Sequence, residues 1–391
     1  MEIKGKATPY PKDKKSNAMK ILLLGGTGAM GKHLTEILLK ENNQVFVTTR
    51  SKRPPLHPHL TYLQGDAKEE SFIAETLQLG PWDAIVDFMI YNTQEFQNRY
   101  KALLSATNHY LFLSSSRVYA ESNLPIQEDS PRLIDQSSDE KFLHTDEYSL
   151  TKARQENLLQ SSEKQNWTII RPYITYSEER LQLGSLEKEI WLYRALHGRS
   201  ILFTEEIGSK LTTLSYGRDV ALGIKSIIGQ TKVFGEAIHI VQPKAITWQE
   251  ALQLYIQLLS NHLGKTPVVK FVDLKTFLTL QHSPYQVLYD RKYDRIFSTK
   301  RIDQYIDTNL FTSPLNGLAS CLKYFFEHPN FSTINWFAQA RIDKICKERT
   351  PLKEIPTTKD RILYLCVRYL PLIVIHHLWS FTTHLKRIIK S

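Results

Sequence analysis

The first half of the chain alternates between short apolar runs and amphipathic stretches with helical spacing. Because strands that alternate with helices form a parallel sheet covered on both faces, this pattern predicts an α/β fold with a doubly wound sheet. The predicted strands are Ile21–Leu24, Gln44–Thr49, Leu60–Leu63, Ala84–Phe88, Tyr110–Leu113 and Trp167–Ile170. The predicted helices are Lys32–Lys40, Glu69–Leu77, Thr93–Thr107 and Tyr148–Leu159, with a polar loop over 117–147 and a later helix over Glu187–His197.

A glycine-rich turn joins the first predicted strand to the first helix, and its glycines fit both G-x-G-x-x-G and G-x-x-G-x-x-G. Glycine permits a tight turn, close approach of a pyrophosphate to the backbone and close contact between helix and strand. The N–H groups and the dipole at the start of the helix favour an anion. The turn therefore predicts a dinucleotide site, the alternative being an ordinary strand–helix turn. Its candidate residues are Gly25, Gly28, Ala29, Met30 and Gly31.

Further polar features follow the ends of the other predicted strands, namely Thr49-Arg50, Asp66 and the cluster Ser114–Ser116. Ligands of such sheets bind beyond the carboxyl ends of the strands, so we expect these residues to line one site. An acidic residue after the second strand would bind the ribose 2′-OH of NAD, whereas an arginine accommodates the 2′-phosphate of NADP. Arg50 therefore favours NADP over NAD, the alternative being a solvated basic turn.

Tyr148 and Lys152 stand four residues apart, which places them on one face of the predicted helix. A lysine ammonium beside a phenol favours the phenolate and lowers a pKa that is about 10 when unperturbed. A tyrosine tuned in this way exchanges a proton with a substrate hydroxyl or carbonyl near neutral pH. Ser115 could hydrogen-bond the same oxygen, so these three are the candidate catalytic residues. The alternative is a surface tyrosine–lysine pair, which is common on helices.

Together with Arg171–Tyr173, these motifs come in the order and spacing of the extended short-chain dehydrogenases/reductases. More narrowly, the chain resembles the NAD(P)-dependent epimerase/dehydratase family that acts on nucleotide sugars, over about residues 19–340. The resemblance implies a Rossmann domain with a smaller, mainly C-terminal substrate lobe. We expect the Rossmann domain at 19–175, with 211–242 returning to it, and the substrate lobe at 176–210 and 243–340.

The resemblance also implies roles for single residues. Tyr148 would be the acid/base, Lys152 would bind the nicotinamide ribose and tune Tyr148, and Asp66 would contact the adenine. The family pattern S-x-x-V-Y selects Ser115 as the catalytic hydroxyl, with Ser116 a close second. The expected function is NAD(P)-dependent epimerisation or ketoreduction of a nucleotide-activated sugar. The alternative is a non-catalytic dinucleotide-binding regulator or an RNA-binding relative, against which the retained Tyr148, Lys152 and Ser115 argue.

The chain departs from the family pattern in two further places. Sugar-nucleotide dehydratases of the family carry an Asp–Glu pair directly after the catalytic hydroxyl residue, where this chain has Ser116 and Arg117. The substitution disfavours 4,6-dehydration. The segment Asp87–Tyr91 replaces the small residues usual after the fourth strand, which predicts an unusual shape for the nicotinamide-side pocket. Arg180 is a weaker candidate for a phosphate contact, and we favour a plain surface arginine.

Charge and composition limit the remaining options. The net charge of +10 resides in the termini, since residues 1–18 carry +3 and residues 341–391 carry +7. The body between the two ends carries no net charge, whereas a groove that binds nucleic acid is lined by clustered positive charge. We therefore expect no nucleic-acid partner. The three separated cysteines form no disulfide framework, which favours a reducing, cytoplasmic location. The histidine spacing predicts no metal site.

Both ends of the chain differ from the body. Residues 1–18 are polar and lysine-rich and predict a disordered leader, or a remnant of cloning, with no secretory signal. Residues 341–391 predict a basic helical extension. Within it, Tyr369–Thr383 lacks charged residues but falls short of the ~20 apolar residues of a spanning helix. We favour a helix that packs on the body or on a second subunit, as in a homodimer. The alternative is peripheral contact with an anionic membrane.

Overall fold

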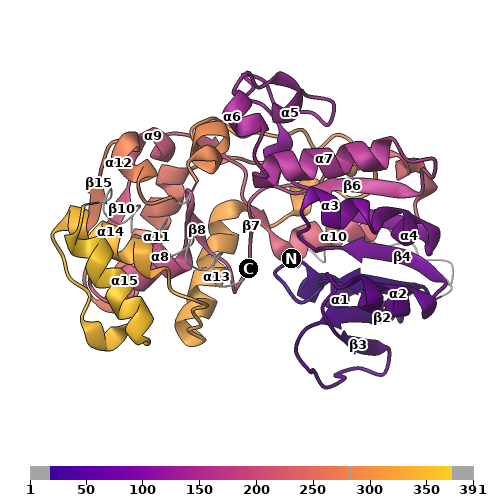
Figure 1. The fold of residues 1–391 in the computed structure, drawn as a ribbon, viewed down its shortest axis with the longest axis horizontal. Coiled ribbons are helices and arrows are strands. Elements are labelled where there is room, and N and C mark those ends of the chain that lie inside the picture. The colour runs from indigo at the N-terminus through magenta and orange to yellow at the C-terminus, as the bar shows by residue number, and fades with distance from the viewer. Residues whose placement is uncertain (1–17, 282, 372–391) are drawn as a thin grey trace, which may run out of the picture.

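The computed structural model describes residues 18–371 except residue 282. Two lobes lie side by side in Figure 1: one holds the large sheet and the other consists mainly of helices. The large sheet has the strand order β13-β6-β5-β4-β1-β2-β3, and all of its pairings are parallel. The predicted doubly wound parallel sheet is therefore confirmed. Its strands are β1 (Lys20–Leu24), β2 (Gln44–Thr49), β3 (Leu60–Gln64), β4 (Trp82–Asp87), β5 (Thr107–Leu113), β6 (Trp167–Arg171) and β13 (Glu236–His239).

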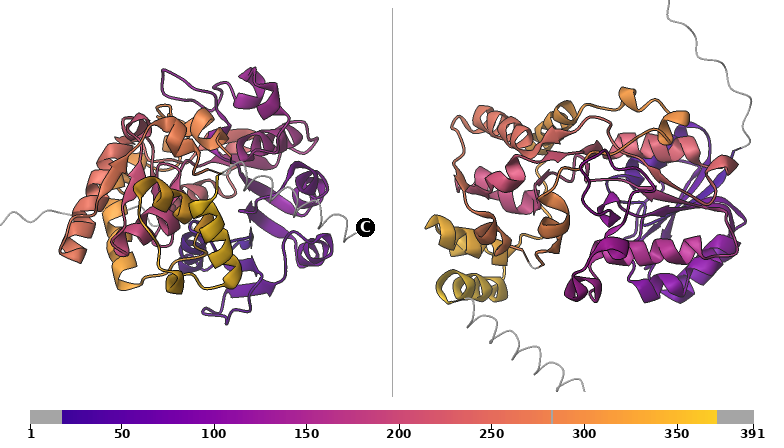
Figure 2. Two further views of the ribbon diagram at one scale, coloured as in Figure 1. Left: turned by 60° about the vertical axis from the view of Figure 1, so that its left-hand side comes forward. Right: turned by 90° about the horizontal axis from the view of Figure 1, so that it is seen from above.

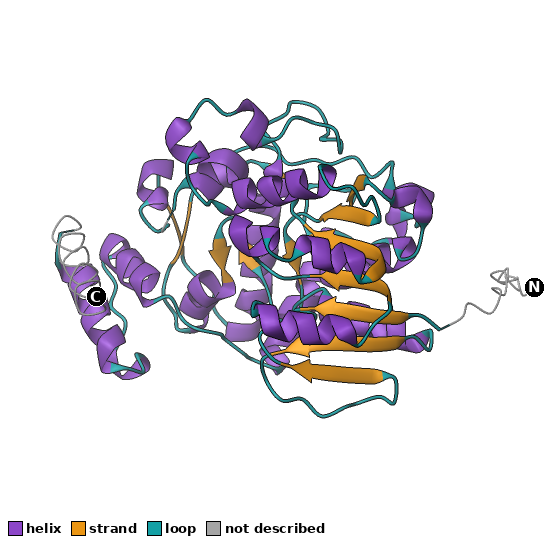
Figure 3. Cartoon of the chain, turned by 45° about the vertical axis from the view of Figure 1, so that its right-hand side comes forward, coloured by secondary structure: helices purple, strands orange, loops and turns teal. Residues whose placement is uncertain are grey.

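Successive side chains of β1 point to opposite faces of the sheet and enter separate cores. Ile21 and Leu23 pack with Leu34, on α1, while Leu22 and Leu24 pack with Phe96, on α3. Helices therefore cover both faces, as Figure 3 shows. One face carries α1 (Gly31–Lys40) and α10 (Gly217–Ile227). The other carries α2 (Glu70–Gln78), α3 (Thr93–Gln97), α4 (Tyr100–Ser105) and α7 (Tyr148–Gln160).

The prediction of one helix over Thr93–Thr107 is wrong, because the chain forms α3 and α4 with a break at Asn98-Arg99, and β5 already begins at Thr107. At the break the buried Arg99 guanidinium donates to the carbonyls of Ala67 and Lys68, both at 2.9 Å. This tertiary contact ties the break to the segment after β3. The predicted loop over 117–147 also contains the short helices α5 (Leu133–Gln136) and α6 (Glu140–Leu143).

The second lobe is built from helices and two-residue or three-residue strand pairs around the largest apolar cluster, which includes Trp191, Trp248 and Phe277. The pair of β7 (Thr175–Tyr176) with β12 (Ser215–Tyr216) lies where the chain passes between the lobes. The other pairs are β8 (Gln182–Leu183) with β9 (Leu186–Glu187), β10 (Ile201–Phe203) with β15 (Val269–Phe271), and β11 (Leu211–Thr212) with β14 (Ile246–Thr247). The helices are α8 (Lys188–Leu196), α9 (Glu205–Gly208), α11 (Trp248–Leu263), α12 (Leu274–Leu278) and α13 (Pro314–Glu327).

The described part of the C-terminal extension forms α14 (Trp336–Cys346) and α15 (Thr358–Tyr369), which lie on the outer side of the second lobe in Figure 2. The fully buried Arg194 of α8 donates to Asp343 at 2.8 Å and to Glu348 at 2.6 Å. Tyr364 of α15 donates to the same Asp343 at 2.7 Å. A buried ion pair and its hydrogen bonds thus hold both helices to the lobe.

Two predictions fall partly outside the described residues. The leader over 1–18 lies beyond them except for its last residue, and the uncharged stretch Tyr369–Thr383 lies beyond them after residue 371. Within residues 18–371, residue 282 aside, no helix has both the length and the apolar composition needed to cross a membrane.

Candidate active site

The glycine turn between β1 and α1 requires glycine at two positions for different reasons. Gly25 has a φ of +68°, a left-handed conformation that side chains disfavour. A Cβ added to Gly31 would lie 2.4 Å from the carbonyl oxygen of Gly26, so this helix start touches the turn backbone directly. A Cβ on Gly28 would meet no atom within 4 Å. The backbone of Gly28 therefore faces open space.

The turn offers unpaired hydrogen-bond donors toward that space. Among the described residues, the N–H groups of Gly28, Ala29 and Met30 have no acceptor, whereas the N–H of Gly25 donates to Thr48 Oγ1 at 2.9 Å. Gly217, at the start of α10, lies against the carbonyl of Ala29 and supports the turn from behind. Unpaired donors at the start of a ten-residue helix fit the pyrophosphate of a dinucleotide.

A cleft of about 410 Å³ lies beside the turn and brings Arg50 and Asp66 together, as the strand-end argument predicted. Arg50 makes no hydrogen bond or ion pair to another described residue. One Asp66 oxygen accepts from the N–H of Lys68 at 2.9 Å, which leaves the other oxygen for a ligand. These residues fit the adenosine half of a dinucleotide, with Arg50 at the end of β2 where a 2′-phosphate would lie.

The bulky segment after β4 lines this same cleft through Phe88, Met89 and Ile90. Met89 lies so close to the turn that a Cβ on Gly25 would come within 2.7 Å of its sulfur. The side chains of this segment thus shape the end of the cleft that holds Arg50 and Asp66. On the other side, the backbone carbonyl of Met89 lies 3.5 Å from Nζ of Lys152.

Lys152 is buried on α7 and donates to the carbonyl of Leu113 at 2.7 Å. Burial lowers the pKa of its ammonium to about 8, although the carboxylates of Asp87 and Glu156 oppose this shift. The amine remains mostly charged at neutral pH. Asp87 is itself fully buried, and it accepts from Tyr110 at 2.8 Å.

Tyr148 begins α7 and lies at the junction of the two lobes. Burial raises the pKa of its phenol above the usual value, while the charges of Arg117 and Arg180 and a hydrogen bond with Ser115 lower it. Ser115 Oγ also accepts from the N–H of Arg117 at 3.2 Å. Tyr148 and Ser115, 33 positions apart in the sequence, therefore meet at the carboxyl end of β5.

The structure distinguishes between the two candidate serines. Ser116 is completely buried, and its hydroxyl donates to the carbonyl of Arg171 at 2.9 Å. Ser115 instead lies beside Tyr148, and its hydroxyl helps to lower the pKa of the phenol. The geometry therefore favours Ser115 as the hydroxyl beside the Tyr148 phenol.

Arg117 is a site residue that sequence reasoning considered only as the replacement for a dehydratase acid. Its guanidinium carbon lies 5.3 Å from the centre of the Tyr148 ring. It forms an ion pair with Glu147 at 2.5 Å and lies 3.9 Å from a carboxylate oxygen of Asp290. Its place two residues after Ser115 was a signal in the sequence, but Asp290 is too distant along the chain to have been paired with it.

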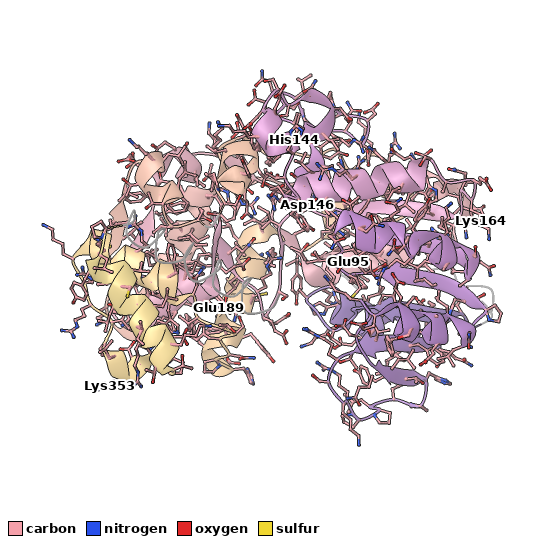
Figure 4. All side chains as sticks on the ribbon, viewed as in Figure 1. Glu95, His144, Asp146, Lys164, Glu189 and Lys353 are labelled. Atoms are coloured by element: carbon pink, nitrogen blue, oxygen red, sulfur yellow. The ribbon has the colours of Figure 1, made fainter. Side chains whose placement is uncertain are left out.

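A second cleft, of about 640 Å³, opens beside Tyr148 and Arg117 and is lined by both lobes. Figure 4 shows Asp146, one of its lining residues, at the junction of the lobes. The wall from the second lobe combines the apolar residues Ile190 and Leu280 with the polar residues Ser185, Glu187, Gln281, Ser283, Tyr285, Gln286 and Asn335. The polar part of this wall suits a ligand rich in hydroxyl groups.

Arg180 forms an exposed ion pair with Glu187 at 2.8 Å, as a surface arginine would. Its charge nevertheless lowers the pKa of the Tyr148 phenol. Within the described part of the chain, no three His, Cys, Asp or Glu side chains are grouped to bind a metal ion.

Residues 25–189 match the family model described as NAD(P)H-binding. This segment is similar to NAD(P)H-binding domains. It contains the glycine turn, the Arg50–Asp66 cleft and the Ser115–Tyr148–Lys152 group. Among solved structures, the chain is similar to dTDP-glucose 4,6-dehydratase from Bacillus anthracis in complex with NAD. That match has 16% identity and a TM-score of 0.61, and covers 79% of this chain and 97% of that one. This likeness shows the fold alone, and it is the fold that the resemblance implied.

Two curated relatives match parts of the chain. The chloroplast stem-loop binding protein of 41 kDa b from Arabidopsis thaliana is 27% identical over 247 residues, covering 60% of this chain and 61% of that protein. The UDP-glucose 4-epimerase of Lactobacillus helveticus is 29% identical over 134 residues, covering 29% of this chain and 41% of that protein. The chain thus spans less than two thirds of the length of either relative.

Proposed function

We propose that the chain is an NAD(P)-dependent epimerase or ketoreductase that acts on a nucleotide-activated sugar. The observation that carries the proposal is the position of Tyr148 and Ser115 between the glycine turn and the second cleft. One sugar-nucleotide enzyme among the relatives and another among the similar structures support this substrate class.

In this proposal the NAD(P)H-binding domain holds the dinucleotide along the edge of the sheet. The N–H groups of Gly28, Ala29 and Met30 bind the pyrophosphate, and Asp66 contacts the adenine. Lys152, fixed between the carbonyls of Leu113 and Met89, binds the ribose of the nicotinamide half. When bound, the cofactor supplies or accepts a hydride at a sugar carbon.

Tyr148 moves the proton that accompanies the hydride. Its phenol gives a proton to the oxygen of a sugar ketone that is being reduced, or takes one from a hydroxyl that is being oxidised. Ser115 hydrogen-bonds the same oxygen and holds it at the phenol. Reduction starts from the protonated phenol, which the buried environment favours. Oxidation, the first half of an epimerisation, needs the phenolate, which nearby positive charge favours.

The residues after Ser115 argue against water elimination. A dehydratase needs carboxyl groups there, but Ser116 is buried against the carbonyl of Arg171 and Arg117 is paired with Glu147. Neither side chain can act as a carboxylic acid. We therefore do not extend to this chain the dehydration named for the Bacillus anthracis enzyme.

We further propose that NADP is preferred over NAD. The Arg50 guanidinium has no partner among the described residues and lines the cleft with Thr49 and Asp66. The carboxyl end of β2 carries no acid that would repel a 2′-phosphate. Arg50 is thus placed to pair with that phosphate.

A ligand screen followed by turnover assays tests the proposed function. Thermal unfolding with NAD, NADP and a panel of nucleotide sugars identifies binders, since a specific ligand stabilises the folded chain by mass action. The bound sugar is then assayed for product. Net NADPH consumption indicates a reductase, and an inverted sugar with retained cofactor indicates an epimerase.

Tyr148→Phe is the deciding variant. It removes only the phenol oxygen, so it should bind the cofactor normally and lose turnover by at least about a hundredfold, the scale of general acid–base catalysis. Tyr369→Phe, on the outer helix α15 and 56% exposed, is the matched control and should keep full turnover. Unchanged turnover in Tyr148→Phe would contradict the catalytic assignment.

A second candidate function is RNA binding, favoured by the name of the Arabidopsis relative. A gel-shift titration with stem-loop RNA at two salt concentrations tests it. Specific binding that competes with NADP would favour this candidate, whereas weak binding that disappears with salt would reflect only the basic ends of the chain.

A further inference from the structure

Arg117 is held rigidly against the catalytic phenol by groups from both lobes. It lies in the turn that follows β5, with its side chain 15% exposed and its guanidinium over the Tyr148 ring. Glu147, the N-cap residue of α7, binds it from the Rossmann lobe. Asp290 approaches it from the second lobe. Groups from both lobes therefore fix the position of Arg117.

The surroundings of Arg117 carry more positive than negative charge. Asp290 also pairs with Arg291 and lies 3.0 Å from Nε of Arg295, and all three side chains are buried. The three arginines face the two carboxylates of Asp290 and Glu147, which leaves one positive charge in excess. Because these groups are mostly shielded from water, solvent screens that charge only weakly.

Of these groups, Arg117 and Glu147 act on the Tyr148 phenol, whereas the Lys152 ammonium is directed elsewhere. The charged groups around the phenol are Arg117 from the turn after β5, Glu147 from α7 and Arg180 from the segment after β7. Burial raises the pKa of the Tyr148 phenol. Among the charged groups, Arg117 lowers this pKa most strongly and Arg180 follows, whereas Glu147 raises it. The Lys152 ammonium, one helical turn along α7, donates to the carbonyl of Leu113 and faces the carboxylate of Asp87.

We propose that Arg117 is a positioning residue that holds a positive charge at the Tyr148 phenol and so stabilises the phenolate. The proposal rests on the proposed function, in which Tyr148 exchanges a proton with the sugar. The family resemblance assigned two roles to Lys152, which are to tune Tyr148 and to bind the nicotinamide ribose. The proposal separates these roles. Arg117 supplies the charge that tunes the phenol, and Lys152 serves mainly to bind the nicotinamide ribose.

The test is a direct titration of the Tyr148 phenol in protein labelled with 3-fluorotyrosine. Fluorine lowers the pKa of every phenol alike, so the titration falls within the range where the chain stays folded. The Tyr148 resonance in the ¹⁹F spectrum is assigned by its absence from Tyr148→Phe. Titrations compare the unmodified sequence with Arg117→Met, Arg117→Lys and Arg180→Met.

The expected result is a rise of about one unit or more in the pKa of Tyr148 in Arg117→Met, the usual effect of losing a nearby opposite charge. A phenol that no longer titrates in the accessible range counts as such a rise. Arg117→Lys keeps the charge and should stay within about half a unit of the original pKa. Arg180→Met should give a smaller rise than Arg117→Met, because Arg180 is exposed and paired with Glu187.

An unchanged pKa of Tyr148 in folded Arg117→Met would overturn the proposal, and so would equal rises in Arg117→Met and Arg117→Lys. An Arg180→Met shift as large as that of Arg117→Met would also overturn it, since net charge alone would then set the pKa. If Arg117→Met fails to fold, Arg117→Gln, which can still bond to Glu147, takes its place. The titration uses neither sugar nor cofactor, so its failure is distinguishable from failure of the proposed function.

Discussion

Substitution of Gly28 by alanine separates cofactor binding from folding at the glycine turn. The added methyl group meets no protein atom within 4 Å, and the backbone of Gly28 is not in a left-handed conformation. The folded chain should therefore tolerate it, with a change in unfolding free energy between zero and a gain of about 1 kcal/mol. The same methyl group projects into the space where the pyrophosphate approaches the N–H groups of the turn.

The loss of binding follows from those hydrogen bonds. A hydrogen bond to a charged group contributes about 1.5–3 kcal/mol, so losing one weakens dinucleotide binding by roughly ten- to a hundredfold. With NADP at one hundred times its original Kd, ligand binding adds about 2.7 kcal/mol to stability. After a hundredfold loss of affinity, the same concentration adds only about 0.4 kcal/mol.

The assay is urea unfolding with and without NADP, run on the unmodified sequence, Gly28→Ala and Gly31→Ala. Gly31→Ala is the contrast, because its methyl group would collide with the Gly26 backbone at 2.4 Å. It should cost about 1–3 kcal/mol of stability even without ligand. A Gly28→Ala variant that binds NADP as tightly as the unmodified chain would refute the placement of the pyrophosphate at this turn.

Three further predictions concern other parts of the molecule. Arg194→Met leaves the buried Asp343 without its ion-pair partner and should cost about 3–5 kcal/mol in urea unfolding, with faster proteolysis of α14 and α15. Acid should destabilise the chain, because burial lowers the pKa of His109 to about 4 and that of His239 to about 3. Below pH ~6.5 the unfolded chain binds protons that the folded chain does not, so each histidine lowers stability by up to about 1.4 kcal/mol per pH unit. His109→Gln should flatten that slope, and an unchanged slope would contradict this account. Arg50→Met should weaken NADP binding about tenfold and leave NAD binding unchanged, as measured by calorimetry, from the loss of one charged hydrogen bond. Equal losses for both cofactors would argue against a 2′-phosphate contact.

Local patterns in the sequence predicted most strands of the Rossmann sheet. Six of its seven strands were predicted in order, because the inner ones are apolar runs buried between two layers of helices and bounded by polar residues. The glycine turn was equally readable, since its requirements are those of the local backbone. The helix predicted over Thr93–Thr107 failed because Arg99 donates to carbonyls of a distant segment, a contact that no local pattern contains.

The sequence by itself determined the fold class, the glycine turn and the identity of Tyr148, Lys152 and Ser115 as candidates. It did so because short-range rules of periodicity, turn geometry and helical spacing apply to those features. Only the tertiary structure decided which serine faces the phenol and where the charge beside it comes from. Arg117 and Asp290 stand far apart in the sequence and meet across the two lobes. Electrostatic fields depend on distance in space, so the charge at Tyr148 becomes visible only once both lobes are in place.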